Sequence, residues 1–197
     1  KRWRKIQYAG YFFAIIAFLW IMKAIHFNRF DFEKQEVEIY SPGLPEKFDG
    51  YKIVQISDFH LGSFTLSQKR VKPLFDSLLA QNADIIVFTG DIVNSFASEC
   101  NGWSPYFERL TSKDKMLAVL GNHDYSAYYK WPEEDFKWLN EMAVRSKIRN
   151  FGFDLLLNEN RTIYREGDSI AIIGIENWGK YFRLRFRWAK KIGRATG

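Results

Sequence analysis

Cysteine and histidine are both scarce in this chain of 197 residues. Cys100 is the single cysteine, which excludes an intrachain disulfide, and we expect it to be a small packed side chain rather than a nucleophile. The histidines are His26, His60 and His123. Internal repeats and low-complexity runs are also missing. Hydrophobic residues make up 47% and charged residues 26%, so the composition is that of a folded protein with room for one domain.

Acidic residues are absent from both ends of the chain. Residues 1–23 carry five positive charges and residues 180–197 carry seven, so the net charge of +6 leaves −6 for residues 24–179. A basic protein often binds nucleic acid. Here the basic residues lie outside the acidic middle, so we expect no nucleic-acid partner for the globular part.

One long apolar run lies near the start. Residues 6–22 are apolar apart from Gln7, and with residues 23–25 they give a stretch of twenty. As a helix this stretch would span ~30 Å, enough to cross a lipid bilayer. We expect residues 1–26 to be a retained transmembrane anchor. A cleaved signal peptide, for which no small-x-small cleavage pattern follows, and a buried helix are the alternatives. Four preceding cations favour a domain outside the cytoplasm.

The remaining pattern predicts an α/β fold with central β-sheets flanked by helices. Residues 27–50 form a connector, with a short strand at 36–40. Apolar runs predict strands at 52–57, 84–89 and 115–120, helices at 71–79 and 131–147, and then strands at 153–158, 161–166 and 169–175. Strands that first alternate with helices and then follow one another are typical of an α/β domain around a sheet.

Polar residues follow each of the first three predicted strands. Asp58 and His60 come after the first strand, Asp91 after the second, and Asn122 and His123 after the third. Ligands of open α/β sheets bind at the carboxyl ends of the strands, so these side chains should converge. Carboxylate, imidazole and amide oxygen suit Mn, Fe, Zn or similar divalent ions. Each short motif alone could be turn chemistry, but their ordered succession favours a functional site.

These residues resemble a known family. The elements D-x-H, G-D-x-x-N and G-N-H-D are similar to those of the calcineurin-like metallophosphoesterase superfamily. The stretch LPEKFDGYKIVQISDFHLGSF resembles its membrane-associated bacterial branch of YaeI- and YkuE-like phosphoesterases. The resemblance implies a metallophosphoesterase-like αββα sandwich. It also implies a hydrolase at the bacterial cytoplasmic membrane.

The resemblance also implies a set of metal ligands. Asp58 and His60 would bind the first of two divalent ions, Asp91 would bridge both, and Asn122 would bind the second through its amide oxygen. The two ions would activate a hydroxide for attack on phosphorus.

Catalytic roles are implied for the residues that follow. His123 would contact the phosphate and assist the leaving group, and Asp124 would orient its ring. Asn94 stands where many relatives have aspartate, and we expect only a supporting role for it.

The chain departs from the family pattern after His123. The family continues with a further histidine and a Gly-His-x-His element, whereas no histidine follows His123, and Glu176 is a carboxylate without motif support. We therefore expect a C-terminally truncated metallophosphoesterase domain over residues 51–179. Residues 180–197 are expected to be a basic aromatic tail outside the native domain. The alternative hypotheses for this tail are contact with anionic lipid and contact with nucleic acid.

The function expected from these observations is a membrane-anchored, metal-dependent phosphoesterase. Its substrate would be a phosphoester or pyrophosphate, such as a lipid or a UDP-diacylglucosamine-like lipid A precursor. The lipid bilayer is an expected partner. The alternatives are an inactive fragment of such an enzyme and a nucleic-acid phosphodiesterase.

Overall fold

The structure is a computed structural model that describes residues 2–65 and 68–177. The chain divides into two compact units, Lys1–Tyr40 and Ser41–Gly197, and each is described by itself. The predicted tail at 180–197 lies outside the described residues.

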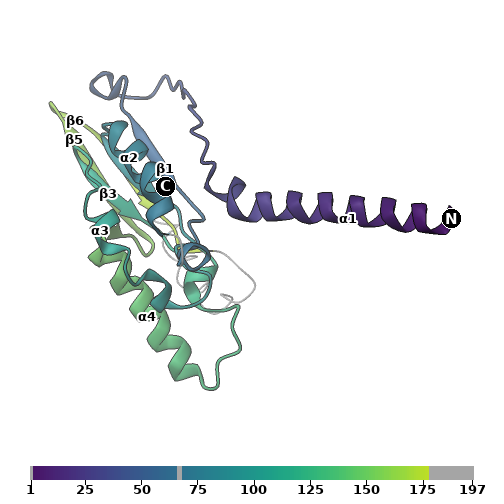
Figure 1. Ribbon diagram of the computed structural model, residues 1–197. Helices are drawn as coiled ribbons and strands as arrows, with labels where there is room; N and C mark the ends of the chain where they lie inside the picture. Colours follow the sequence, from purple (N-terminus) through teal and green to yellow (C-terminus); the bar gives the residue numbers. More distant parts are fainter. Residues whose placement is uncertain (1, 66–67, 178–197) are drawn as a thin grey trace. The chain divides into compact units, whose positions relative to one another are not determined.

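The first unit is a single long helix with an irregular segment after it (Figure 1). Helix α1 runs over Arg2–His26, and the stretch Trp3–Phe30 has a length and an apolar composition that suit a membrane span. The strand predicted at 36–40 is wrong, because residues 31–40 have no regular secondary structure. Val37 and Ile39 are exposed there, and an alternating pattern gives no stable strand without a partner strand.

The second unit is built on a four-stranded parallel sheet in the order β1-β2-β3-β4. The strands are β1 (Ile53–Ile56), β2 (Ile85–Phe88), β3 (Lys115–Ala118) and β4 (Asp154–Leu155). The β2 sequence IIVF is apolar throughout because both faces of this central strand are covered.

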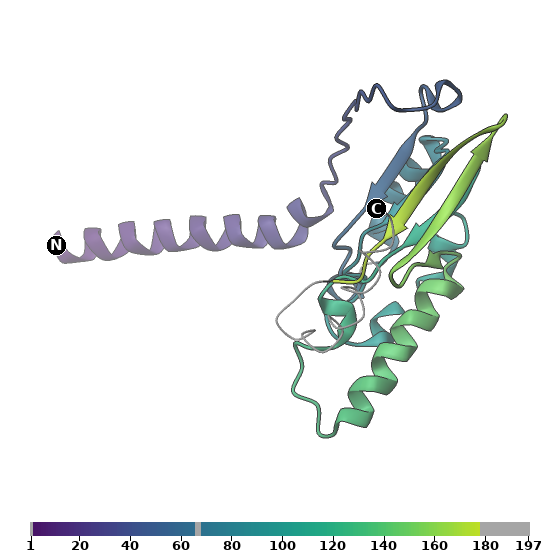
Figure 2. The ribbon, with the colours of Figure 1, turned by 180° about the vertical axis from the view of Figure 1, so that it is seen from behind.

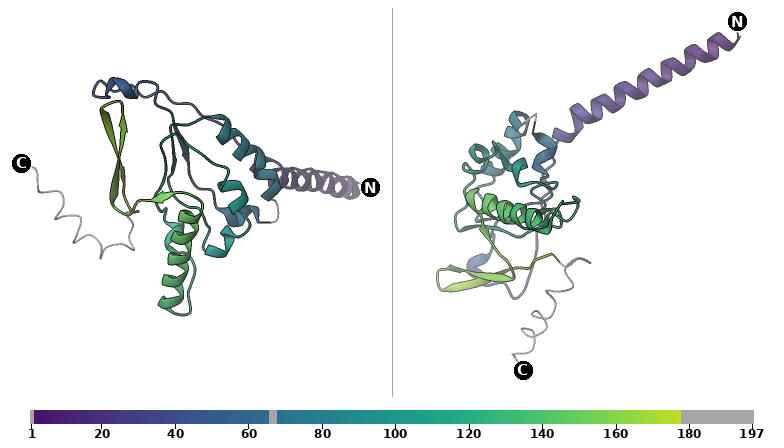
Figure 3. Two further views of the ribbon diagram at one scale, coloured as in Figure 1. Left: turned by 90° about the vertical axis from the view of Figure 1, so that its left-hand side faces the viewer. Right: turned by 90° about the horizontal axis from the view of Figure 1, so that it is seen from below.

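A two-stranded antiparallel hairpin covers one face of this sheet (Figures 2 and 3). It consists of β5 (Glu159–Arg165) and β6 (Asp168–Gly174). Buried side chains between the two layers form one core cluster. Its members are Phe48, Ile85, Leu117, Leu156 and Ile163.

Three helices lie on the other side of the sheet (Figure 3). They are α2 (Lys72–Ala80), α3 (Ser104–Phe107) and α4 (Glu134–Asn150). Aromatic side chains fill the space beneath them. Phe107 stacks on Phe151 with ring centroids 4.3 Å apart, and Phe88 of β2 contacts Phe153 at 5.9 Å.

The predicted α/β fold class, with central sheets flanked by helices, is confirmed. Strands β1 to β4 are shorter than the apolar runs that predicted them, and the last residues of the first three runs belong to the loops of the site. Strand β5 instead begins two residues before the strand predicted at 161–166. Pro73 lies in the first turn of α2, where its missing N–H costs nothing. Helix α3 was not predicted, since its four residues carry too little periodicity. Cys100 is buried, as expected.

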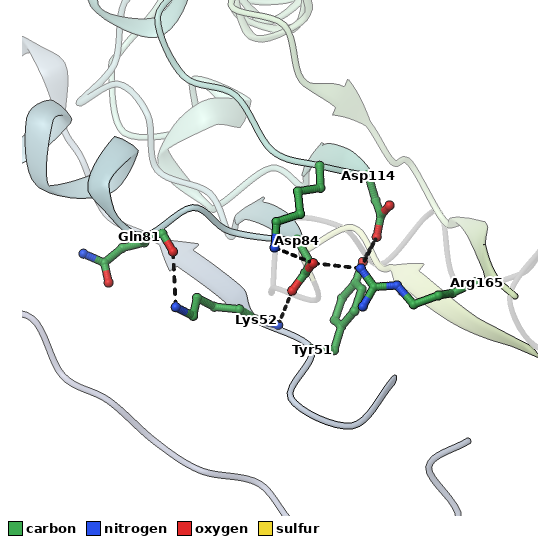
Figure 4. Close-up of polar contacts among 7 residues, drawn as sticks. Tyr51, Lys52, Gln81, Asp84, Asp114 and Arg165 are labelled. Atoms are coloured by element: carbon green, nitrogen blue, oxygen red, sulfur yellow. Dashed lines mark hydrogen bonds and ion pairs between the residues drawn. The ribbon is translucent and has the colours of Figure 1, made fainter. Parts of the chain in front are cut away.

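A polar network lies at the amino ends of the strands, opposite the predicted site (Figure 4). Asp84, 5% exposed, accepts bonds from Lys52 N at 2.8 Å and from Lys113 Nζ at 3.1 Å. Arg165 of β5 donates to the same carboxylate at 2.8 Å. Burial acts to raise the pKa of Asp84, but these donors outweigh it and lower the pKa to about 2. The network fastens the hairpin to the sheet.

Candidate metal centre

The loops after β1 and β2 are joined through their backbones. Asp58 N donates to Gly90 O and His60 N to Asp91 O, both at 3.0 Å. Asp58, His60 and Asp91 adopt φ values of 52°, 48° and 60°, in the left-handed region that non-glycine residues seldom enter. Such conformations cost free energy and cluster at functional sites, where surrounding contacts impose them.

Two glycines allow the second and third loops to meet. A Cβ on Gly90 would lie 2.2 Å from Gly121 N, and a Cβ on Gly121 would lie 2.1 Å from Asp91 Oδ1. Real Cβ atoms do not approach so closely. The glycines of the GD and GNHD motifs therefore permit close approach of the two loops that carry the site.

Asp124 fixes the loop after β2 from below. Its fully buried carboxylate accepts the backbone amides of Asp91 at 2.8 Å, Ile92 at 2.9 Å, Val93 at 3.3 Å and Gly121 at 3.0 Å. Burial raises the pKa of this carboxyl to about 6, although the amide hydrogen bonds act to lower it. Asp124 therefore holds the backbone of the loop after β2, which carries Asp91.

The role expected for Asp124, orienting the His123 ring, is corrected by these contacts. His123 Nδ1 lies 2.7 Å from the carbonyl oxygen of Asn94. A carbonyl only accepts, so Nδ1 carries the proton and Nε2 is the ring nitrogen left for a ligand. Asn94 thus supports the site through its backbone rather than its side chain.

Glu99 and Asn140, which were not predicted from the sequence, also accept backbone amides of this loop. Together with Asp124 they form a set of side-chain acceptors that we call the amide clamp. Glu99 accepts the amides of residues 94, 95 and 96 at 2.6, 2.9 and 2.9 Å, and that of Gly62 at 3.2 Å. Asn140 of α4 accepts the amide of Ala97 at 2.9 Å. Every amide from Asp91 to Ala97 is therefore bonded to a side-chain oxygen. Glu99 accepts the amide of Phe96, which is half of a capping box, but phenylalanine has no side-chain acceptor for the other half, so the sequence carries no capping signal here.

The structure brings three predicted residues into one cluster. One ligand atom each of His60, Asp91 and His123 lies within 4.8 Å of the others, a group that could hold a metal ion. The two imidazole rings meet edge to face at 4.7 Å and 90°. Asp91 Oδ1 also accepts the backbone amide of His123 at 2.8 Å, which fixes the carboxylate.

The donors of this cluster fit a divalent ion. His60 Nδ1 is buried and has no hydrogen-bond partner among the described residues. A buried polar atom without a partner is costly, and a metal ion would satisfy a site of this kind. Imidazole with carboxylate suits Zn, Mn or Fe.

Asp58 and Asn122 lie at a cavity of about 340 Å³ that adjoins the cluster. Asp91 lines the same cavity, so it belongs to both groups. The Asp58 carboxylate accepts Ser57 Oγ at 2.5 Å. The full lining is Ser57, Asp58, Thr89, Gly90, Asp91, Val119, Leu120, Gly121, Asn122, Ile175 and Asn177.

Tyr128 is a site residue that the sequence analysis also missed. Its ring stacks on His123 with centroids 4.3 Å apart and planes at 18°. Its hydroxyl accepts Asn122 Nδ2 at 2.7 Å.

Glu176, considered as a substitute ligand, is engaged elsewhere. Its carboxylate accepts Tyr125 Oη at 3.1 Å and Asn158 Nδ2 at 2.7 Å, and Arg145 lies 3.7 Å away. These contacts give it a structural role.

The sheet and the His–Asp cluster at its carboxyl edge define a metallophosphoesterase fold. The sequence profile described as "Calcineurin-like phosphoesterase" matches residues 51–193. The chain belongs to this family of hydrolases, as the motifs predicted.

Several curated proteins are similar to the chain. The uncharacterized metallophosphoesterase YkuE of Bacillus subtilis is 36% identical over 74% of this chain and 48% of its own length. A transmembrane protein with metallophosphoesterase domain from Danio rerio is 27% identical over 72% of the chain and 30% of its own length. The UDP-2,3-diacylglucosamine pyrophosphatase LpxG of Chlamydia muridarum is 35% identical over 43% and 27%. The chain thus spans less than half the length of these relatives.

Proposed function

We propose that this protein is a membrane-anchored, metal-dependent phosphoesterase that hydrolyses a phosphoester or pyrophosphate bond. The observation that carries the proposal is the His60–Asp91–His123 cluster beside a cavity lined by Asp58 and Asn122. In this proposal residues 1–26 are the anchor, 27–50 the connector and 51–179 the catalytic domain.

Four side chains would hold two divalent ions: Asp58, His60, Asp91 and Asn122. Asp91 lies both in the cluster and at the cavity, which supports a bridging role. When bound, the ions would supply the Lewis acidity and positive charge that phosphoryl hydrolysis needs. The bonds from Asp124 and Glu99 to backbone amides would keep the loop rigid, so that the Asp91 carboxylate stays in place beside the ions.

His123 would act on the phosphate and the leaving group. Because Nδ1 donates to Asn94 O, Nε2 is the ring nitrogen left for the substrate. In the imidazolium form Nε2 would donate to a phosphate oxygen and pass its proton to the leaving oxygen, which leaves the ring neutral with its remaining proton on Nδ1. His60 lies beside it, at the edge of the ring.

A lipid with a phosphate or pyrophosphate group is the substrate class that we propose. The support is the similarity to a UDP-2,3-diacylglucosamine pyrophosphatase, together with an apolar helix that suits a membrane span. The negative charge of residues 24–179 makes nucleic acid a poor substrate. We place the protein in the bacterial cytoplasmic membrane, with the catalytic domain on the extracytoplasmic side.

A second candidate is a metal-binding protein without turnover. The observation that favours it is the number of imidazoles, because the cluster among the described residues holds two, those of His60 and His123. Such a protein would bind an ion at the cluster and leave phosphodiesters intact.

Hydrolysis of bis-p-nitrophenyl phosphate by the full chain in detergent, with added Mn²⁺, tests the proposal. We expect turnover by the wild type. Loss of a hydrogen-bond partner of a metal ligand usually lowers metal affinity or activity by about 10–100-fold. Asp91→Asn changes a proposed ligand itself, so it should lower the rate by at least about 100-fold. Asp76→Asn, on the surface of α2, is the matched control and should keep the rate. Metal binding without turnover would favour the second candidate.

A further inference from the structure

Tyr128 contacts two motif residues at once. It lies in the loop before α4, where its ring stacks on His123 at 4.3 Å and its hydroxyl accepts Asn122 Nδ2 at 2.7 Å. Asn122 lines the cavity and His123 belongs to the cluster. One side chain therefore joins the two parts of the site.

In the contact with Asn122, the amide nitrogen is the end that lies against Tyr128. An asparagine side chain has a donor nitrogen and an acceptor oxygen, and rotation by half a turn exchanges them. A metal ion binds the oxygen only. Because the nitrogen donates to Tyr128 Oη, the oxygen is directed away from Tyr128 and remains available for an ion.

The contact with His123 fixes the plane of its ring. Nδ1 is hydrogen-bonded to Asn94 O, which fixes the edge of the ring that carries Nδ1. The stacked face of Tyr128, at 18° to the imidazole, prevents it from tilting. The edge-to-face contact with His60 depends on the same orientation.

We propose that Tyr128 is a positioning residue of the metal centre, whose hydroxyl presents the Asn122 amide oxygen to the ion and whose ring aligns His123. The inference rests on the proposed function. The hydroxyl of Tyr128 should affect Asn122 and its ring should affect His123, so substitutions can separate the two effects. The side chain is 60% exposed, so its replacement does not open the core.

Tyr129 offers a matched control. It is 46% exposed and packs against Phe96 and Trp131, at ring distances of 4.8 and 5.0 Å. Tyr129→Phe removes a hydroxyl from the same loop without touching the contacts of Asn122 or His123.

The first measurement is Mn²⁺ affinity of the full chain in detergent by isothermal titration calorimetry. Tyr128→Phe should weaken binding by about tenfold, the usual effect of losing a partner of a metal ligand, while Tyr129→Phe should match the wild type. Equal affinities for Tyr128→Phe and the wild type, or an equal loss in Tyr129→Phe, would overturn the inference and leave the proposed function standing. If the wild type binds no Mn²⁺, both fall.

A double-mutant cycle separates orientation from a general structural effect. Aspartate has two equivalent oxygens, so Asn122→Asp presents an oxygen to the ion whichever way it rotates. In that background Tyr128→Phe should no longer weaken Mn²⁺ binding. A full tenfold loss there would contradict the orienting role.

The ring contact has its own readout in proton NMR. The His123 ring protons should carry an upfield ring-current shift in the wild type and in Tyr128→Phe, and lose it in Tyr128→Leu. Unchanged His123 shifts in Tyr128→Leu would overturn the alignment role.

Discussion

The buried carboxylate of Asp124 accepts the backbone amide of Asp91 at 2.8 Å. The aspartate of the GNHD motif therefore holds the loop that carries the GD motif. Through this bond and its neighbours, the position of the proposed bridging ligand depends on a residue that faces away from the cavity. The geometry of the centre is therefore set by the backbone beneath it.

Replacement of Asp124 should destabilise the domain strongly. Asp124→Ala leaves the amides of Asp91, Ile92, Val93 and Gly121 without their acceptor in a buried place. At about 1–3 kcal/mol for a buried unsatisfied group, the loss should reach at least ~3 kcal/mol. Chemical unfolding in detergent measures it. Asp49→Ala, an exposed aspartate, should change the free energy of unfolding little, and equal stability of the two variants would contradict the clamp.

Gly121→Ala should impair metal binding. The added Cβ would lie 2.1 Å from Asp91 Oδ1, so the carboxylate or the loop must move. We expect Mn²⁺ affinity to fall by at least about tenfold. Gly43→Ala is the control, because nothing lies within 4 Å of its added Cβ. Retention of wild-type affinity by Gly121→Ala would show that the two loops need not approach so closely.

Asp84 should make the domain lose stability in acid. Its pKa is about 2 in the folded protein, below the ordinary value of 3.8, so its contribution is present above about pH 4 and is lost as the pH falls towards 2. The shift corresponds to ~2 kcal/mol. Asp84→Asn should therefore be less stable than the wild type at about pH 5, with the difference shrinking towards pH 2. Unfolding free energies measured across that range would refute this if the difference stayed constant.

Helix α1 should retain the protein in membranes. Arginine near the centre of a span costs about 2.5–3.5 kcal/mol, so Ile16→Arg with Leu19→Arg should move the protein from the membrane pellet to the carbonate-soluble fraction. Val37→Arg with Ile39→Arg adds the same charges to the irregular segment after the helix and should leave the protein in the pellet. Identical fractionation of the two variants would argue against a span.

The residues of the site were predictable to different extents. Asp58, His60 and Asp91 were found because parallel strands end at one edge and the sequence places polar residues there. Tyr128 and Asn140 could not be found in this way, since they reach the site only through the fold of the loop before α4 and of α4 itself.

Adjacency in the sequence was misleading in two places. Asp124 follows His123, yet its carboxylate accepts four backbone amides, three of them in the loop after β2, and the His123 ring bonds to Asn94 O instead. The pattern at 36–40 alternates like a strand but has no partner strand among the described residues. Local patterns do not contain the tertiary contacts that decided both cases.

Metal content per chain shows whether Asp91 belongs to a two-metal centre. The full chain, purified in detergent and dialysed after loading with Mn²⁺, is analysed by elemental analysis beside Asp91→Asn and the surface control Asp76→Asn. We expect two Mn²⁺ per chain in the wild type and in Asp76→Asn, and a loss of bound metal in Asp91→Asn. No retained metal in the wild type, or equal content in Asp91→Asn, would contradict a metal centre built on Asp91.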